Sequence, residues 1–466
     1  MSEELTWMPV WKMRELIGKR ELSPVEVTEH FLGRIEQYDG KLKSFAYLDA
    51  KGARAQAKLA EKAVTDGNEL GLLHGIPVSI KGHFYAKGMP FFDMGTGEDL
   101  PSAWRDEVQV ERFRSSGAIL FGENTLMASG GNHKMSPTDT GSRYNWDVEA
   151  RSAWDQNRVP GWSSSGTATA TVARLIPLGL GSDGGGSTRL PAAYSGVVGV
   201  VATPGVIPWV HPASPTIEIT ASTGPMSRYV EDVALATQAL AGHDGRDVFS
   251  RWDEPEDFLA TINEGVDGMR FAWSDDLGYA SMYALEESPR VIAAIREAAF
   301  GFNQLGATVQ ETDETFDDFF PGFQMMNRVF GSGGRGTGTK PTDQEYWESM
   351  EYRKRNIDAL KRIFGDHDVL LTPTSQLLAR TVEDWDAAWT GRDGKEYQYG
   401  TFAGHYVSHV QIFNWLAVPA FSIPCGFVDG LPVGLQIVGR PGTDAKMFRI
   451  AQAFQKAFPR DERPEL

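Results

Sequence analysis

Residues 161–187 read GWSSSGTATATVARLIPLGLGSDGGGS, and this stretch differs in composition from the rest of the chain. Glycine, serine and threonine fill 15 of its 27 positions, and Asp183 is its only acid. Such a composition is also typical of a flexible linker. The apolar residues 175–178 and the alternation of alanine and threonine before them do not fit a linker. We therefore predict a turn, a helix of small residues, a strand and a glycine-rich turn where the backbone approaches a neighbour closely.

Outward from this stretch, the chain alternates between helix and strand patterns. Ser23 and Glu26 form the pattern of a capping box, which predicts a helix starting at Pro24. Strands that alternate with helices over such distances indicate an α/β sheet. We expect further helices near 52–65, 106–116 and 444–458, strands at 75–80, 118–121, 369–371, 421–423 and 433–438, and a mostly helical stretch from about 231 to 365.

The composition is that of a soluble globular protein with an acidic surface. The 466 residues carry 45 basic and 62 acidic side chains, which gives a formal net charge of −17. This charge argues against binding to nucleic-acid phosphates or to an anionic membrane. The single Cys425 cannot form an intramolecular disulfide, and the acidic N-terminus is not followed by the apolar segment of a signal peptide. We therefore expect a cytoplasmic protein without a membrane span.

Three motifs fit their usual functions poorly. Residues 179–184 match G-x-G-x-x-G, but a dinucleotide site also needs an acid about 20 residues later, and the next acid after the motif is Glu218. His405 and His409 have the i, i+4 spacing of a zinc helix, but Tyr406 stands where that helix needs glutamate. The G-x-S-x-G elbow of an α/β-hydrolase is absent. We expect no metal and no cofactor.

What remains is serine chemistry with a lysine in place of a histidine. A serine hydroxyl becomes an effective nucleophile only when a base removes its proton. A neutral lysine can act as this base. Lys81 follows the apolar residues 76–80, where a charged side chain fits well only if it points into a polar site. Taken alone, this lysine fits a surface position at a strand end better than a catalytic role.

Three segments resemble the amidase signature family. Residues 75–81 (GIPVSIK) resemble the strand that carries the family's catalytic lysine. Residues 160–167 (PGWSSSGT) resemble its P-G-G-S-S-G-G-S motif, and residues 181–193 (GSDGGGSTRLPAA) resemble its second serine motif. Ser163 and Ser187 are 24 residues apart, which is the spacing in the family. The similarity covers most of the chain, because it continues at residues 23–26, 224–228, 371–374, 423–426 and 431–440.

The resemblance implies an α/β fold of the amidase-signature type, with a central mixed β-sheet flanked by helices on both faces and a helical insertion. It implies a single domain over residues 1–466, with the core signature at about 75–205. It also implies a Ser–cis-Ser–Lys triad, in which Ser187 attacks a carbonyl carbon to form an acyl-enzyme. Ser163, held by a cis peptide bond after Trp162, would relay the proton to Lys81.

The resemblance further implies how the turn around Ser187 acts. Its backbone amides would form an oxyanion hole for the tetrahedral intermediate. Asp183 and Arg189 would hold the turn in place rather than touch substrate. The amides expected to form the hole are those of Gly184, Gly185, Gly186 and Ser187.

The chain departs from the family pattern around the expected substrate. Trp162 and Ser165 stand where the family has glycines, and Lys81 is followed by Gly82 rather than by an acid. Residues 200–206 lack two basic residues of the family motif. An uncharged, apolar or aromatic acyl group therefore fits better than a glutamine-like one. The candidate pocket walls are Met127, Trp162, Trp209, Met325, Met326 and Phe330, with residues 331–338 as a lid.

The sequence thus predicts a cofactor-independent amidohydrolase that cleaves the C–N bond of an amide, an anilide or a carbamate (urethane). Aryl acylamidase and urethanase are the specific activities that this includes. The expected partner is a small-molecule substrate, with no nucleic acid and no membrane, and the assembly could be a homodimer. The alternative is a non-catalytic family member or an amidotransferase-type subunit that works through partners, which the acidic surface disfavours.

Overall fold

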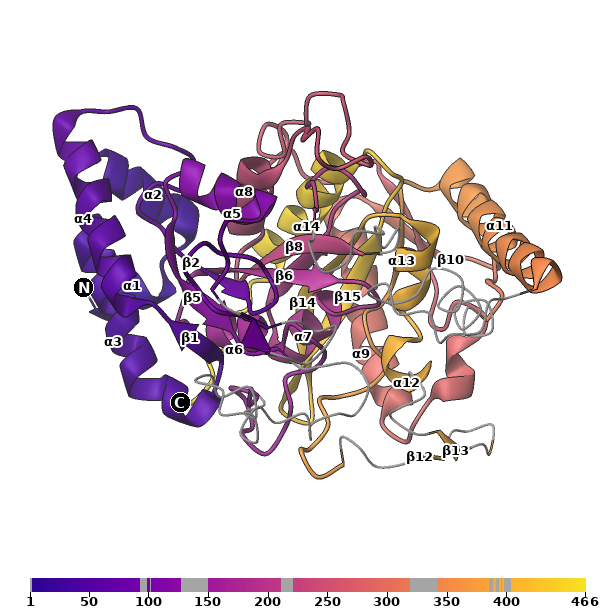
Figure 1. Ribbon diagram of the computed structural model, residues 1–466. Helices are drawn as coiled ribbons and strands as arrows, with labels where there is room; N and C mark the ends of the chain where they lie inside the picture. The colour runs from indigo at the N-terminus through magenta and orange to yellow at the C-terminus, as the bar shows by residue number, and fades with distance from the viewer. Residues whose placement is uncertain are drawn as a thin grey trace.

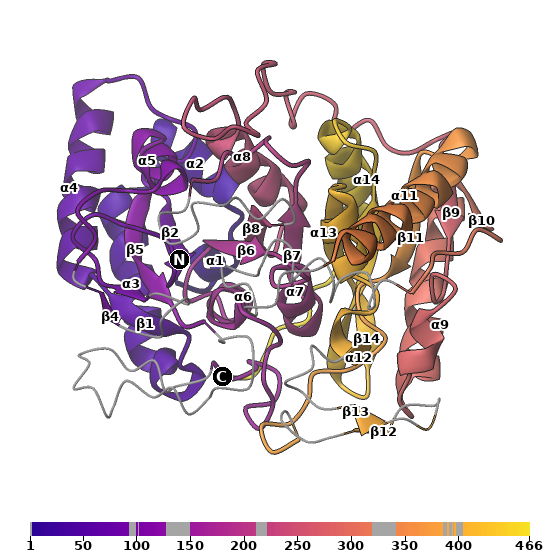
Figure 2. The ribbon, with the colours of Figure 1, turned by 45° about the vertical axis from the view of Figure 1, so that its right-hand side comes forward.

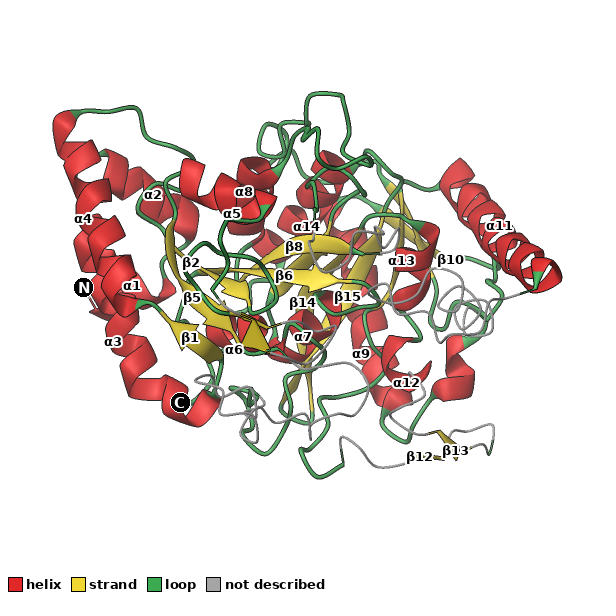
Figure 3. Ribbon diagram, viewed as in Figure 1, coloured by secondary structure: helices red, strands yellow, loops and turns green. Residues whose placement is uncertain are grey.

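The computed structural model describes residues 2–92, 99–100, 102–126, 150–210, 221–318, 342–384, 389–390, 394, 396–397 and 404–466. Within these residues the chain builds one large mixed sheet with helices on both faces (Figures 1 and 3). This is the α/β architecture that the sequence predicts. Among the described helices, none has the length and apolarity needed to cross a membrane.

The central sheet joins segments from nearly the whole chain. In spatial order the described strands are β1 (Phe45–Leu48), β5 (Ile119–Asn124), β2 (Pro77–Lys81), β6 (Leu178–Asp183), β8 (Ser222–Ser227), β7 (Val198–Val201), β14 (Ala420–Val428), β15 (Leu431–Val438), β11 (Val369–Pro373), β9 (Arg270–Trp273) and β10 (Thr308–Glu311). The strands β5, β2 and β6 run parallel to one another, as do β11, β9 and β10 at the other end. The neighbours between these two groups are antiparallel.

Two short strand pairs lie outside the central sheet. They are β3 (Phe91–Phe92) with β4 (Asp99–Leu100), and β12 (Trp389–Thr390) with β13 (Glu396–Tyr397). The helices are α1 (Ser2–Trp7), α2 (Val10–Gly18), α3 (Pro24–Leu42), α4 (Ala50–Asp66), α5 (Val108–Ser115), α6 (Ser165–Val172), α7 (Arg189–Ser195), α8 (Val230–Leu240), η2 (Ala280–Tyr283), α9 (Ser288–Phe300), η3 (Gly301–Leu305), α11 (Asp343–Asp366), α12 (Gly404–Val407), α13 (Gln411–Leu416) and α14 (Asp444–Ala457).

The N-terminal helices follow from local sequence signals. The Ser23 side chain accepts hydrogen bonds from the amides of Val25 and Glu26, and the Glu26 side chain accepts one from the Ser23 amide. The predicted capping box is therefore present at the start of α3. The helices α3 and α4 lie at the β1 end of the sheet, and α11 lies toward the β10 end (Figures 1 and 2).

The stretch 161–187 folds as predicted, into a turn, the helix α6, the strand β6 and a second turn. Its glycines explain how α6 and α7 approach the sheet. A Cβ added at Gly179 would meet the Thr167 side chain at 2.5 Å, and one at Gly199 would meet Ala192 at 2.6 Å. These two helices therefore cover one face of the sheet at a distance that larger side chains would prevent.

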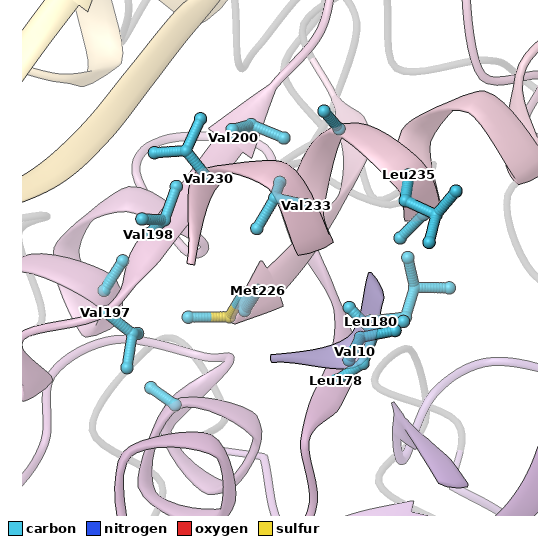
Figure 4. Close-up of a cluster of buried hydrophobic side chains, with 14 of the residues drawn as sticks. Val10, Leu178, Leu180, Val197, Val198, Val200, Met226, Val230, Val233 and Leu235 are labelled. Atoms are coloured by element: carbon cyan, nitrogen blue, oxygen red, sulfur yellow. The ribbon is translucent and has the colours of Figure 1, made fainter. Parts of the chain in front are cut away.

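The opposite face of the sheet carries the apolar side chains. Residues that alternate with the glycines along β6 and β7 point away from α6 and α7 and pack under α8. Figure 4 shows part of this core, formed by Leu178, Leu180, Val198, Val200, Val230, Val233 and Leu235.

The stretch 231–365 is not purely helical, contrary to the sequence prediction. It contains α8, α9 and α11, but it also contributes β9 and β10 to the end of the central sheet. These strands are only four residues long, and β10 exposes three of its four residues. Such short edge strands have little apolar periodicity, because only one side of the ladder and part of one face are covered.

Glu123 on β5 is an unusual buried carboxyl. Its side chain is completely buried, and in the described chain neither carboxylate oxygen has a hydrogen-bond partner. Burial raises the pKa of Glu123 well above its usual value. The group is therefore held in the protonated form at neutral pH, which still leaves the cost of an unsatisfied polar group.

Replacing Glu123 by methionine should stabilise the fold. A methionine of similar length removes the unsatisfied polar atoms, so we expect the free energy of unfolding to rise by about 1–3 kcal/mol at neutral pH. The folded pKa of Glu123 is raised, so the wild type loses stability relative to the variant as pH increases above the unfolded value of 4.5. Urea denaturation at several pH values measures both effects.

The variant Glu123→Gln is the matched control. It keeps a buried polar group but cannot titrate, so it should abolish the pH dependence without the full gain in stability. Equal stability of the wild type and the methionine variant at every pH would contradict this assignment.

Candidate active site

Lys81 ends β2 on the face of the sheet covered by α6 and α7. Its side chain is 1% exposed, and its Nζ donates hydrogen bonds to Ser163 Oγ at 2.6 Å and to Ser182 Oγ at 2.9 Å. Because β2 and β6 are parallel neighbours, Lys81 and Ser182 lie at carboxyl ends of strands that meet at the same edge. This edge is where open α/β sheets usually bind their ligands.

Ser163 and Ser187 approach each other through their backbone neighbours. The Ser164 amide donates to the Ser187 carbonyl at 3.1 Å. Ser163 is 5% exposed and Ser187 is 8% exposed, so the two hydroxyls lie just beneath the surface. The structure therefore gathers Lys81, Ser163 and Ser187, although in the described chain no direct hydrogen bond joins the two serine hydroxyls.

The expected cis peptide bond is not present. All peptide bonds of the described residues are trans, including the bond between Trp162 and Ser163. The turn that starts at Gly161, whose φ is +113°, already brings the Ser163 hydroxyl to Lys81 with a trans backbone. The prediction of a cis serine was therefore wrong for this structure.

A buried ion pair holds the turn before Ser187. Arg189 donates from Nε and Nη2 to the Asp183 carboxylate, each at 3.0 Å, and both side chains are fully buried. Arg189 Nη1 also donates to the Val410 carbonyl at 3.0 Å and to Gln436 Oε1 at 2.8 Å. Asn414 Nδ2 donates to Asp183 Oδ1 at 2.9 Å, and Arg189 Nη2 donates to Asn414 Oδ1.

The electrostatics of Asp183 follow from this network. Burial alone would raise the pKa of the Asp183 carboxyl. The charge and hydrogen bonds of Arg189, together with the Asn414 amide, outweigh burial and hold the pKa of Asp183 below its usual value. The carboxylate is therefore ionised at any pH at which the protein is folded.

The glycine-rich turn is wrapped around the same carboxylate. The Gly186 amide donates to Asp183 Oδ1 at 2.7 Å, and the Thr188 amide donates to Asp183 Oδ2 at 3.0 Å. The expected oxyanion hole included the Gly186 amide, which is committed to Asp183 instead. Glycine is required there, because its φ is +112° and a Cβ would lie 2.5 Å from the Val410 side chain.

The predicted pocket walls separate into three groups. Trp162 is 5% exposed and its ring lies 5.4 Å from the Tyr406 ring, so it lines the site next to Ser163. Trp209 packs instead near His83, beyond Lys81, and its Nε1 donates to Glu107 Oε1 at 2.7 Å. The remaining candidates lie outside the described residues; they are Met127, Met325, Met326, Phe330 and the loop 331–338.

Sequence reasoning missed several polar residues of the site. Ser182 is a direct partner of Lys81 and lies within the second serine motif, so its position beside Asp183 was the available signal. Asn414 and Gln436 contact the turn from more than 200 residues away. No local pattern marks those two, because their role depends only on how α13 and β15 pack.

The remaining motif residues have structural contacts. The His409 ring is buried, with Nε2 2.9 Å from the Asp275 carbonyl, and burial lowers its pKa to about 4. The side chain of His405 lies outside the described part of the chain. Within the described residues, no three side chains of the metal-ligating types gather at one point. Cys425 is buried as well, and burial raises the pKa of its thiol to about 12.

Comparison with known proteins gives the family. The family model described as Amidase matches residues 26–321 and 322–448, and the chain therefore belongs to the amidase family. A glutamyl-tRNA(Gln) amidotransferase subunit from Thioalkalivibrio sulfidiphilus (strain HL-EbGR7) is 32% identical, over 94% of this chain and 95% of that one. The corresponding subunit from Anaeromyxobacter dehalogenans (strain 2CP-C) is 30% identical, over 94% of each chain.

Solved structures show the same fold. A bacterial aryl acylamidase of the amidase signature family matches with a TM-score of 0.80 at 23% identity, over 97% of this chain and 96% of that one. The same glutamyl-tRNA(Gln) amidotransferase subunit from Thermotoga maritima matches with a TM-score of 0.77 at 24% identity, over 99% and 98%. The chain is thus a member of an enzyme family that acts on amide C–N bonds, as hydrolases or as amidotransferase subunits.

The variant Asp183→Asn should be strongly destabilised. It keeps the shape of the side chain but leaves the Arg189 charge buried without a counter-charge, which costs about 3–5 kcal/mol of unfolding free energy. Urea denaturation measures this loss. The variant Lys354→Ala breaks the exposed pair with Asp358 on α11 and should change stability little. A similar small effect of both substitutions would contradict the importance of the buried pair.

Proposed function

We propose that the chain is an amidohydrolase that cleaves the C–N bond of an uncharged amide, anilide or carbamate through an acyl-enzyme on Ser187. The observation that carries the proposal is the buried contact of 2.6 Å between Lys81 Nζ and Ser163 Oγ. This contact lies one residue from the backbone bond between Ser164 and Ser187. A buried amine next to a hydroxyl relay is what a serine nucleophile needs when no histidine serves as base.

The proposed reaction has two stages. Ser187 Oγ attacks the carbonyl carbon while its proton passes to Ser163 Oγ, and the proton of Ser163 passes to neutral Lys81. The C–N bond then breaks as the proton returns through Ser163 to the leaving nitrogen. A water molecule hydrolyses the resulting ester by the same relay. The amides of Gly184, Gly185 and Ser187 stabilise the negative oxygen in each tetrahedral intermediate.

The substrate proposal rests on the surroundings of Ser163. Trp162 and Tyr406 form an aromatic wall beside it, and Val410 and Leu190 lie against the Gly186 turn. Apolar surfaces of this kind favour an apolar or aromatic acyl group over a charged one. Aryl acylamides and aryl carbamates are therefore the first substrates to test.

A second function is supported by the curated relatives, which are amidotransferase subunits. In that case the chain would act through partner chains rather than alone. The purified chain would then hydrolyse none of the probes 4-nitroacetanilide, 4-nitrophenyl acetate and ethyl N-(4-nitrophenyl)carbamate. Turnover of any of them at a rate that depends on Ser187 favours the independent hydrolase.

Replacing Ser187 by alanine should lower turnover by more than about 10³-fold, because no nucleophile remains. Intact-mass spectrometry should detect an acyl or carbamoyl adduct on the wild type and none on the variant. The variant Ser195→Ala, in the same helix α7 and equally buried, is the control and should keep its activity. An adduct that persists on Ser187→Ala would assign the nucleophile to another residue.

Replacing Lys81 by methionine should lower kcat by about 10²–10⁴-fold, since the base is removed while the buried volume is filled. Thermal unfolding should show a folded protein, because methionine suits a position that is 1% exposed. Steady-state kinetics on 4-nitrophenyl acetate and 4-nitroacetanilide measure the change. Activity within threefold of the wild type would refute a role of Lys81 as base.

A further inference from the structure

Gln411 is a buried polar residue that the proposed reaction has not used. It is the first residue of α13 and is 1% exposed. A Cβ added at Gly185 would meet Gln411 Nε2 at 3.0 Å and its Cδ at 3.3 Å. The carboxamide of Gln411 therefore lies against Gly185, one of the residues whose amides would bind the oxyanion.

The carboxamide has unused hydrogen-bonding capacity. Its Oε1 is buried and has no hydrogen-bond partner in the described chain. Buried side-chain amides are usually satisfied, so an exception needs an explanation, which at an active site is often a missing ligand. The position next to Gly185 indicates that this ligand is the group bound by the glycine-rich turn.

The position of Gln411 is set by the ion pair that holds the nucleophile turn. The carbonyl of the preceding Val410 accepts a hydrogen bond from Arg189 at 3.0 Å. Three residues later, Asn414 donates to the Asp183 carbonyl at 3.1 Å and to its carboxylate at 2.9 Å. The helix start is thus pinned on both sides of Gln411, so its side chain is presented to the turn with little freedom.

The oxyanion hole has a place for an additional donor. The Gly186 amide donates to Asp183 and is not directed at substrate. An oxygen that becomes negative in the transition state gains most from several preorganised donors in a water-excluded site. A neutral carboxamide N–H is such a donor, and only a glycine at position 185 lets it approach, since a Cβ would occupy the same space.

We propose that Gln411 is a side-chain donor of the oxyanion hole, with its Nε2 hydrogen-bonded to the substrate oxygen that becomes negative when Ser187 attacks. This proposal rests on the proposed function, because it concerns the same reaction. It assigns to α13 a direct catalytic role in addition to anchoring Asp183 and Arg189.

The test compares two near-isosteric variants, Gln411→Met and Gln411→Glu, with the wild type. Neither an apolar side chain nor a carboxylate can donate to the oxyanion. We expect kcat to fall by about 10²–10³-fold on both 4-nitroacetanilide and 4-nitrophenyl acetate, with KM changed less than threefold. Both substrates should respond alike, because both form an oxyanion on the same acetyl carbon.

A second measurement separates catalysis from a structural role. A boronic acid forms an anionic tetrahedral adduct with serine and so mimics the intermediate. Its inhibition constant should rise in the methionine variant by a factor similar to the fall in kcat. The inhibition constant of a substrate-like product, acetate, should stay within threefold. A merely structural effect would weaken both inhibitors or neither.

The matched control is Gln452→Met, which replaces a buried glutamine on α14, outside the described site. Its kinetics should equal those of the wild type. Wild-type kinetics in Gln411→Met would overturn the proposal while leaving the proposed function intact. A loss confined to the anilide would also overturn it, since that result would assign Gln411 to the leaving N–H. Absence of turnover by the wild type on every probe would overturn the proposed function and this inference with it.

Discussion

The buried ion pair between Asp183 and Arg189 is the contact on which the rest of the site depends. Both side chains are fully buried, and taking two charges out of water costs several kcal/mol for each. The structure offsets this cost with hydrogen bonds to nearly every polar atom of the pair, from backbone amides, from Asn414 and to Gln436. Because these partners come from β6, α7, α13 and β15, the pair ties the turn of Ser187 to the C-terminal part of the chain.

The order of strands in the sheet supplies the other half of the site. Lys81 comes from β2, which is a parallel neighbour of β6, so the lysine reaches the same edge as Ser182 and Asp183. Glycines along β6 and β7 let α6 and α7 pack closely against this face of the sheet. The amine of Lys81 is thereby enclosed among hydroxyl groups, while the charged pair lies on the far side of the nucleophile turn.

Much of the fold could be predicted because its signals are local. The capping box at Ser23, the small-residue helix α6 and the strand β2 each depend on residues within a few positions. The strands β9 and β10 could not be predicted in this way. They are short and lie at the end of the sheet, so their existence depends on pairing with β11 rather than on their own pattern.

The sequence by itself determined the family, the identity of the chemical groups and the turn that presents Ser187, because these are written in contiguous motifs. Only the tertiary structure decided which groups meet. It withdrew the Gly186 amide from the oxyanion hole, placed Trp209 beyond Lys81, and brought Asn414, Gln436 and Gln411 to the turn. The physical reason is distance along the chain: contacts between residues more than 200 positions apart depend on packing of the whole sheet and leave no local pattern.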